Sequence, residues 1–405
     1  MVMFISRVLV CDGSERAALA VVRSLGMKGI EVEASDSSSF NTSSLSRYCC
    51  SSMRYPSPEK NRKAFADWFY SRIKTRGYEA VYPVTDFTSF PLSFFKKKFS
   101  AYTRIPLPDF HVFMKAYDKN KTLEIASENG VPIPKTYFAI RESDLKKILR
   151  SVSYPAVVKP RSKIFWVGEK PVMLKVKKSN YVNSAEELIK KYYEIRKKLP
   201  CPIIQEFIEG EAYGVEALFN QGEPRAIFVH KRLREYPVTG GASTLRIGVK
   251  HPKLQSIALK LLKAMDWHGV AMVEFKVDSK GNPFLIEVNG RFWGSLPLAI
   301  ASGVDFPFLL HKMVTEGDVD KVFNYRTGVK CRWLLPGDLL HFGHYFFNGP
   351  GRTQKMKEFF SDLMVQDDII SLDDPMPTLG AIGSMLCQAS DVLKGRKTVT
   401  GEILK

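Results

Sequence analysis

The sequence is poor in cysteine, and its cysteines are not spaced for cross-linking or for zinc. Six cysteines occur among 405 residues, no two of them form a Cys-x-x-Cys pair, and Cys49 and Cys50 are adjacent. A disulfide framework and a cysteine-based zinc site both need suitably spaced pairs. The composition therefore predicts free thiols in a reducing compartment, and the expected location is the cytoplasm.

Long apolar runs are also missing. A transmembrane helix needs about 18 or more consecutive apolar residues, and no stretch of that kind is present. The start, MVMFISRVLVCDG, has a short apolar run but lacks the small-residue cleavage ending of a secretory signal. With 45% hydrophobic and 25% charged residues, the chain predicts a globular protein of two or three domains and no transmembrane segment.

Acidic residues are in deficit. The chain has 60 Lys and Arg against 42 Asp and Glu, which gives a formal net charge of +18. That sign favours anionic partners, among them polyanions, membrane surfaces and small molecules with phosphate or carboxylate groups. The basic residues are spread through helix-like segments, and no nucleic-acid-binding motif accompanies them. We therefore expect no nucleic-acid partner.

The first 115 residues alternate strand and helix patterns. Strands are expected over residues 8–11, 31–34 and 80–84, and helices over residues 16–25 and 63–74. This alternation predicts a parallel α/β domain built from right-handed crossovers. The first turn has a single glycine, Gly13, and lacks the Gly-x-Gly-x-x-Gly fingerprint. An NAD-dependent oxidoreductase is therefore a weak alternative.

A polar face stands out in a hairpin near the three-quarter point. Glu287, Asn289 and Arg291 alternate in LIEVNGRFWGS, so an extended backbone places them on one face. The turn SKG pairs this strand with GVAMVEFKVD, which carries Glu274. Carboxylate and amide oxygens suit Mg²⁺, with Mn²⁺ as an alternative, whereas zinc would need His or Cys. The alternative for each acid alone is a solvent-facing strand residue.

Two further features of this hairpin bear on ligands. A guanidinium such as that of Arg291 can hold a phosphate or a carboxylate through two parallel hydrogen bonds. Trp293 follows in the same run, and it fits a packing role in a core as well as a wall for a substrate.

These motifs resemble the ATP-grasp family, in its carboxylate-amine ligase-like group, with similarity to the large chain of carbamoyl-phosphate synthase. VEFKVD followed by IEVNGRFWGS resembles the family's metal-binding Glu…Glu-x-Asn-x-Arg. AYDKNKT, GVPIPKT, YPAVVKP and IIQEFIEGEAYGVEA resemble successive segments that hold the nucleotide. HKRLREYPVTGGAST and NGRFWGSLPLAIASGVDFP are typical of the group. Judged from these motifs, the similarity covers roughly residues 1–315.

The resemblance implies an α/β fold in which two ATP-grasp subdomains clasp the nucleotide. A parallel pre-ATP-grasp domain would span residues 1–115, and the two subdomains would span residues 116–204 and 205–315. Residues 316–405 are expected to form a mainly helical extension, since LLPGDLLHFGHYFF and LGAIGSMLCQASDVLKG are amphipathic. The extension would pack on the body, pair two protomers as a homodimer or contact a membrane.

The resemblance also implies roles for individual residues. Lys119 and Lys159 would contact ATP phosphates, and the segment from Gln205 through Glu206 and Phe207 to Ile208 would form the adenine hinge. Glu211, with Glu216 as the alternative, would hold the ribose hydroxyls. Glu274, Glu287 and Asn289 would bind one or two Mg²⁺ ions, while Arg291 would steady the transferring phosphoryl group.

The stretch HKRLREYPVTGGAST is expected to contact substrate. Arg232 and Arg234 join Arg291 as charge-stabilising catalytic candidates, and the proposed substrate-binding residues are His230, Gly240, Gly241, Ser243 and Trp293. A solvated basic strand followed by a loop is the alternative reading.

One departure from the family concerns the phosphate loop. Many ATP-grasp enzymes carry a glycine-rich loop after the second lysine, whereas this chain has KPRSKIFWVGEKPV with one glycine, Gly168. Arg161, Ser162 and Lys163 could supply side-chain donors in place of backbone amides. The other explanation is a loop that orders only when ATP binds.

The activity implied is that of an ATP- and Mg²⁺-dependent ligase. It would activate a small-molecule carboxylate as an acyl phosphate and couple it to an amine. A small-molecule kinase or a carbamoyl-phosphate-type enzyme is the first alternative, and a non-catalytic ATP-binding module is the second.

Overall fold

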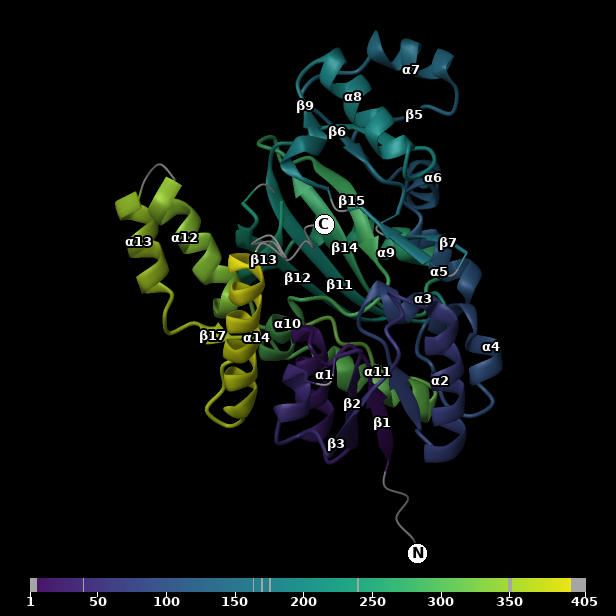
Figure 1. The fold of residues 1–405 in the computed structure, drawn as a ribbon, viewed down its shortest axis with the longest axis vertical. Coiled ribbons are helices and arrows are strands. Elements are labelled where there is room, and N and C mark those ends of the chain that lie inside the picture. The colour runs from purple at the N-terminus through teal and green to yellow at the C-terminus, as the bar shows by residue number, and fades with distance from the viewer. Residues whose placement is uncertain are drawn as a thin grey trace, which may run out of the picture.

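The computed structural model describes residues 6–38, 40–162, 164–168, 170–174, 176–238, 240–348 and 352–394. Within those residues a seven-stranded sheet lies between two smaller units (Figure 1). The N-terminal domain lies at one end of the view and a four-stranded unit with α7 and α8 at the other, while α12, α13 and α14 flank the sheet.

The N-terminal domain is the parallel α/β unit that the sequence predicts. Its strands follow the order β3-β2-β1-β4, and every neighbouring pair is parallel. The strands are β1 (Arg7–Val10), β2 (Glu31–Asp36), β3 (Ser51–Arg54) and β4 (Ala80–Tyr82). The helices are α1 (Arg16–Gly26), η1 (Thr42–Leu45), α2 (Arg62–Arg76), α3 (Asp86–Phe94), α4 (Lys96–Phe99) and α5 (Phe110–Tyr117).

Alternation along β1 explains how this sheet is covered on both faces. Val8 and Val10 join the core that includes α1, whereas Leu9 joins the core that includes Phe65 and Phe69 of α2. A strand buried on both faces reads as an unbroken apolar run, as RVLV does.

The second unit is a small antiparallel sheet with the order β5-β10-β6-β9. Its strands are β5 (Thr136–Phe138), β6 (Ala156–Lys159), β9 (Tyr181–Val182) and β10 (Ile203–Glu206), and its helices are α7 (Glu142–Leu149), η2 (Lys178–Asn180) and α8 (Ala185–Arg196). A separate hairpin, β7 (Ile164–Val167) and β8 (Lys170–Met173), leaves this unit, and we call it the flap. The sheet ends at Glu206, two residues beyond the predicted limit at residue 204.

The central sheet has the order β15-β14-β11-β12-β13-β16-β17. Its strands are β11 (Glu211–Asn220), β12 (Glu223–Tyr236), β13 (Ala242–Gly248), β14 (Gly269–Val277), β15 (Pro283–Asn289), β16 (Lys330–Arg332) and β17 (Gln366–Asp367). One face packs on α6 (Lys119–Glu128) and α9 (Pro252–Ala264). The other packs on α10 (Leu296–Ala301), α11 (Phe306–Glu316) and the N-terminal domain. The predicted β14–β15 hairpin is confirmed.

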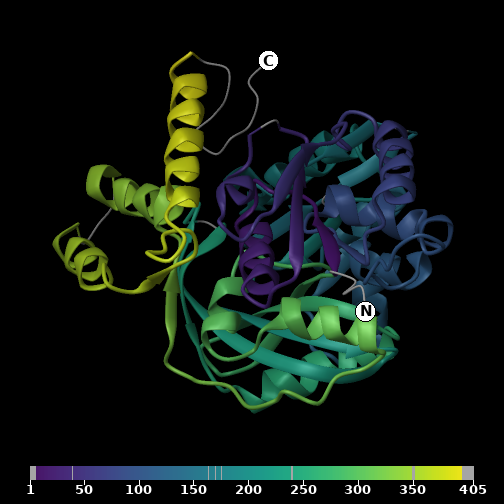
Figure 2. The same cartoon turned by 90° about the horizontal axis from the view of Figure 1, so that it is seen from below.

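The C-terminal extension contains the expected helices, η3 (Leu334–Asp338), α12 (Leu339–Asn348), α13 (Arg352–Ser361) and α14 (Met376–Leu393). It also adds two short strands to the central sheet, β16 and the edge strand β17, which the sequence did not reveal. Figure 2 shows α12, α13 and α14 grouped along one flank of the molecule. No helix among the described residues is long and apolar enough to cross a membrane.

Buried ion pairs dock this extension on the body. Asp368 accepts from Arg16 at 2.6 Å and also pairs with Arg246, and both Asp368 and Arg246 are fully buried. The same pattern recurs in the pairs Arg23–Asp374 and Arg234–Asp362. A further buried pair, Arg332–Asp338, lies within the extension itself. A buried charge that loses its partner is strongly destabilising. The extension is therefore an integral part of the folded body.

We expect Asp368→Ala to lower the free energy of unfolding by about 3–5 kcal/mol, because it leaves Arg16 and Arg246 as uncompensated buried charges. The matched control is Asp373→Ala, because Asp373 is 60% exposed and its pair with Arg47 is exposed as well. An exposed pair contributes about 0–1 kcal/mol. Urea unfolding followed by circular dichroism gives both values, and equal losses in the two variants would contradict the docking role of Asp368.

Candidate active site

Two carboxylates and an amide converge at the edge of the central sheet. Glu274 and Glu287 are direct cross-strand neighbours on β14 and β15. The Asn289 amide donates to Glu274 Oε1 at 2.9 Å and to Glu287 Oε1 at 3.3 Å. A β-bulge follows Glu274 in the ladder, and bulges turn side chains toward a common point. The set predicted from alternation is therefore assembled.

The glycine of this motif has a steric cause. A Cβ on Gly290 would lie 2.4 Å from the ring of Trp267, which is fully buried. The chain can leave β15 along this path only without a side chain at that position.

Two cations neutralise the facing carboxylates. Lys119 Nζ lies 2.7 Å from Glu287 Oε2, and Arg232 Nη2 lies 2.5 Å from Glu274 Oε2. Lys119 is the first residue of α6, where the Asp118 side chain caps the helix by accepting from the Asn120 N–H. The carboxylates are thus held by groups from a helix and from β12 that lie far apart in the sequence.

Arg291 links this group to the N-terminal domain. Its Nε lies 3.1 Å from Asp86 Oδ2, and its Nη2 donates to Asn289 Oδ1 at 3.3 Å. Sequence reasoning missed Asp86. A usable signal was present, because Asp86 follows β4 at the carboxyl edge of the parallel sheet, where ligand-binding residues gather.

Lys159 faces the group from the second unit. Its ammonium donates to Gln205 Oε1 at 2.8 Å, and Gln205 in turn donates to Thr136 Oγ1 at 2.9 Å. Burial, assisted by the positive charge of Lys119, lowers the pKa of Lys159 to about 8. Lys159 is therefore a lysine whose charge changes near neutral pH.

The predicted hinge lies between the two sheets. The Glu206 N–H donates to the Lys135 carbonyl and the Phe207 N–H donates to the Pro155 carbonyl, both at 3.0 Å. The Phe207 ring is 38% exposed and meets Tyr181 edge-on at 5.5 Å. Ile208 follows in the link to β11.

The two ribose candidates occupy very different surroundings. Glu211 is exposed and pairs with Lys231 at 2.6 Å. Glu216 is fully buried, accepts from Ser295 at 2.9 Å and lies 3.0 Å from His230 Nδ1. Burial raises the pKa of Glu216 well above its usual range and lowers that of His230 well below. Burial therefore favours the uncharged form of both groups.

The structure places the other predicted substrate residues apart from the carboxylate group. His230 packs against Gly214, where an added Cβ would lie 2.3 Å from the imidazole. Trp293 is 1% exposed in the core and packs edge-on against Phe306. Arg234 pairs with Asp362 of the extension at 2.7 Å, so it belongs to the docking cluster.

The turn between β12 and β13 accounts for the remaining substrate candidates. Gly240 has a φ of 121°, and a Cβ on Gly241 would lie 2.0 Å from the Tyr236 carbonyl. Ser243 is buried and donates to the Leu245 carbonyl at 3.2 Å. The two glycines are needed by the turn itself.

The polar residues just before the flap form hydrogen bonds within the protein. Arg161 Nε donates to Asp118 Oδ1 at 2.7 Å, and Ser162 Oγ donates to the Ile164 carbonyl at 2.9 Å. Lys163, the third predicted donor, lies outside the described residues. The missing glycines are thus not replaced by Arg161 or Ser162 in this conformation.

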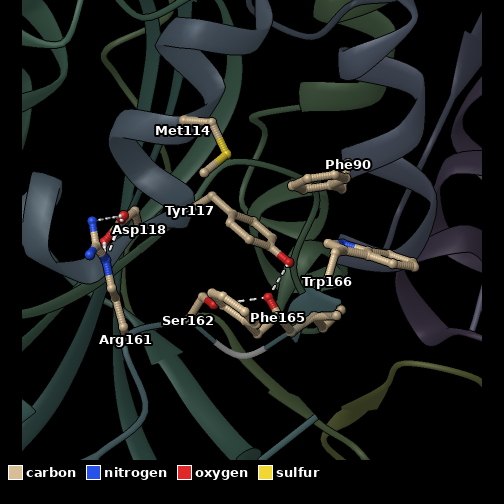
Figure 3. Close-up of a pocket in the computed structure, with 9 residues that line it drawn as sticks. Phe90, Met114, Tyr117, Asp118, Arg161, Ser162, Phe165 and Trp166 are labelled. Carbon is tan, nitrogen blue, oxygen red and sulfur yellow. Dashed lines mark hydrogen bonds and ion pairs between the residues drawn. The ribbon is translucent and has the colours of Figure 1, made fainter. Parts of the chain in front are cut away.

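Two pockets share Tyr117 in their lining, and only the smaller one includes residues of the carboxylate group. The smaller is lined by Asp86, Ala116, Tyr117, Lys119, Glu287, Val288 and Asn289. The larger encloses about 300 Å³ beside the flap, and Figure 3 shows Tyr117 and Trp166 among its walls.

The donor set fits a hard divalent cation. Two carboxylates and an amide offer oxygen ligands, and Mg²⁺ usually takes one or two carboxylates and shares phosphate oxygens. Within the described ranges, no cluster of three or more His, Cys, Asp or Glu residues forms a metal site. A site of two acids and an amide would leave coordination positions that water and phosphate oxygens can fill.

Comparison with known proteins gives a consistent picture. A family model described as ATP-grasp in the biosynthetic pathway with Ter operon matches residues 198–335. A D-alanine–D-alanine ligase from Pelotomaculum thermopropionicum is 30% identical over 224 residues, which cover 49% of this chain and 67% of that protein.

Solved structures share the fold. An L-amino acid ligase from Bacillus licheniformis superimposes with a TM-score of 0.59 at 19% identity, covering 76% of this chain and 74% of that one. The biotin carboxylase domain dimer of 2-oxoglutarate carboxylase from Hydrogenobacter thermophilus, crystallised with MgADP, ADP and bicarbonate, gives 0.61 at 17% identity, covering 80% and 73%.

The Arg232–Glu274 pair generates a test of the carboxylate group. Arg232→Ala removes a cation that opposes binding of a divalent ion, so we expect the protein without nucleotide to bind Mn²⁺ about tenfold more tightly. Glu287→Gln removes a ligand and should weaken binding by a similar factor. Electron paramagnetic resonance of free Mn²⁺ measures both changes.

The matched control is Lys231→Ala, the neighbouring lysine, which pairs with the exposed Glu211. Its Mn²⁺ affinity should stay at the wild-type value. An equal gain in the Lys231 and Arg232 variants would show a general charge effect and would exclude Glu274 as a cation ligand.

Proposed function

The chain belongs to the ATP-grasp family, and we propose that it is an ATP- and Mg²⁺-dependent ligase that activates a carboxylate and couples it to an amine. The observation that carries this proposal is the convergence of Glu274, Glu287 and Asn289 with the cations Lys119 and Arg291. Binding of a nucleotide alone does not need oxygen ligands matched to a phosphate-bridging metal. Transfer of a phosphoryl group does.

We infer that ATP lies between the two sheets. The hinge from Gln205 to Ile208 would contact the adenine, since it joins the second unit to the central sheet. Lys159 and Lys119 would meet the phosphates, because their ammonium groups face the carboxylate pair from two sides. When bound, Mg²⁺ would supply charge neutralisation at the phosphate oxygens, held by Glu274, Glu287 and Asn289.

The chemistry proceeds in two balanced steps. A carboxylate oxygen of the substrate attacks the γ-phosphorus, the bond to the β–γ bridging oxygen breaks, and ADP leaves. The amine nitrogen then attacks the acyl carbon, phosphate leaves, and the nitrogen loses a proton to give the amide. Arg291 would hold the anionic oxygens of the carboxylate and the transferred group, while Asp86 orients its guanidinium.

The relatives favour an amine acceptor, and therefore ligation, over the acceptors of the alternative enzymes. The named relative joins two D-alanine molecules and the named structural neighbour is an amino acid ligase. A small-molecule kinase or a carbamoyl-phosphate-type enzyme would use the same activation step, so the acceptor separates them. The expected cytoplasmic setting agrees with the unpaired state of Cys11, Cys49, Cys50, Cys201 and Cys331. A homodimer would bury exposed apolar residues of the extension such as Met364 and Leu372.

Trapping with hydroxylamine tests the proposal. The protein is incubated with ATP, Mg²⁺ and a pool of carboxylates, and hydroxamate and phosphate are measured. Hydroxamate formation that depends on ATP supports acyl phosphate chemistry. A phosphorylated product without hydroxamate would favour the kinase, and bound ATP without turnover over broad pools would favour the binding module.

Arg291→Ala should keep the fold but reduce ATP-dependent hydroxamate formation by about 10²–10³-fold, because it removes a positioned charge-stabilising donor. The matched control is Arg326→Ala, since Arg326 is exposed and donates only to the Ala301 carbonyl among its described contacts. Steady-state rates with circular dichroism of each variant give the comparison. A wild-type rate in the Arg291 variant would remove it from the mechanism.

ATP affinity should fall as pH rises through about 8, the pKa of Lys159. The folded-state pKa lies below the usual value, so the ammonium loses its proton at a pH where ordinary lysines keep theirs. We expect about tenfold weaker binding at pH 9 than at pH 7.5, since a contact between charged groups contributes about 1.5–3 kcal/mol. Fluorescence titration with an ATP analogue measures it.

Lys159→Arg should flatten this pH dependence, because a guanidinium stays protonated throughout the range. Lys121→Arg, a change at an exposed position of α6, should leave it intact. A wild-type pH profile in the Lys159→Arg variant would assign the titration to another group.

A further inference from the structure

The larger pocket is not used by any step of the proposed reaction. It encloses about 300 Å³ and lies between the flap, α3 and the junction of α5 with α6. Its walls are mostly apolar, as Figure 3 shows for the labelled side chains. The lining residues are Phe90, Met114, Tyr117, Asp118, Arg161, Ser162, Ile164, Phe165 and Trp166.

Aromatic packing builds this pocket. The Trp166 ring lies 5.6 Å from Phe90 at an interplanar angle of 32°, and the Phe90 ring lies 5.1 Å from Tyr117. The Arg62 guanidinium covers the Trp166 ring at 4.9 Å. The Tyr117 hydroxyl donates to the Ile164 carbonyl at 2.6 Å. The flap is thereby held against α3 with its aromatic side chains lining the pocket.

The charged residues of the lining cancel one another. Arg161 pairs with Asp118 at 2.5 Å and also donates to it through Nε at 2.7 Å. A closed ion pair presents little net charge, so the pocket should reject a charged side chain.

The two pockets share one wall residue. Tyr117 lines both pockets, and the next two residues divide between them, with Asp118 in the larger and Lys119 in the smaller. Glu287 and Asn289 line the smaller pocket. A substrate whose carboxylate lies beside Lys119 would therefore have the apolar space on the other side of Tyr117.

We propose that this pocket is the subsite for the apolar body of the carboxylate substrate, and that this substrate is an aromatic or branched-chain carboxylic acid. Its volume matches the lower end of small-molecule sites, about 300–1,000 Å³. The proposal rests on the proposed function for the position of the carboxylate. It adds the class of substrate, which the metal and phosphate groups do not specify.

Equilibrium binding tests the subsite without relying on turnover. Isothermal titration calorimetry in the presence of MgADP compares 3-phenylpropanoate, propanoate and the doubly charged glutarate. We expect 3-phenylpropanoate to bind at least tenfold more tightly than propanoate, from burial of its ring, and glutarate to bind no better than propanoate. Equal affinities, or a preference for glutarate, would overturn the subsite.

Substitution at Met114 locates the binding. Met114→Phe fills the pocket and should reduce the preference for 3-phenylpropanoate over propanoate to about twofold or less, with propanoate affinity unchanged. Met114→Ala opens the pocket and should retain the preference. Met27→Phe is the matched control, because Met27 is 55% exposed at the end of α1 and should behave like wild type. A preference that is the same in both Met114 variants would place the binding elsewhere and overturn the proposal.

The hydroxylamine assay with the same acids separates this failure from that of the proposed function. Selective binding that responds to Met114 without any hydroxamate would overturn the ligase and support the subsite. Hydroxamate formed equally well from all three acids would support the ligase and overturn the subsite.

Discussion

The packing around the site depends on two like charges that lie opposite each other at the edge of the central sheet. Glu274 and Glu287 are direct cross-strand neighbours, an arrangement that is unfavourable unless cations or a metal compensate for it. The compensation comes from distant parts of the chain, from Lys119 on α6 and from Arg232 on β12. The hairpin is therefore stabilised by a helix and another strand, whose cations neutralise the two carboxylates.

The same need for compensation joins the domains. Arg291 leaves the sheet beside the carboxylates and finds its counter-charge in Asp86 of the N-terminal domain. Toward the other end of the sheet, the buried Arg246 is matched by Asp368 of the extension, and within the extension Arg332 is matched by Asp338. These acidic side chains neutralise arginines in the interior, although the chain as a whole carries a net positive charge.

The sequence predicted those features that depend on local pattern. Alternation placed Glu287 and Asn289 on one face, and a short turn brought Glu274 opposite them, because a hairpin fixes its own register. Asp86 was missed because its partner, Arg291, lies about 200 positions away, and nothing in either local pattern names the other. The strands β16 and β17 were missed because they are short and lie in a segment that was predicted to be mainly helical.

His230 and Arg234 show where pattern reasoning fails. Both are polar residues on a strand next to the site. Composition alone cannot distinguish such residues from residues that bind a ligand. Their surroundings distinguish them, since His230 lies in the buried core beside Glu216 and Arg234 meets an acid of the extension. A polar residue on a strand is informative only when the element that covers its face is known, and that element can be distant in sequence.

The flap shows a different solution to a problem shared by phosphate-binding folds. Glycine-rich loops offer backbone amides and remain mobile, at an entropic cost when they close. Here Trp166 stacks on Phe90 under Arg62, and Tyr117 holds the Ile164 carbonyl. Aromatic rings bring a large contact area with few rotatable bonds. The side chains that hold the flap also line the larger pocket, so the packing that fixes the flap makes that space mostly apolar.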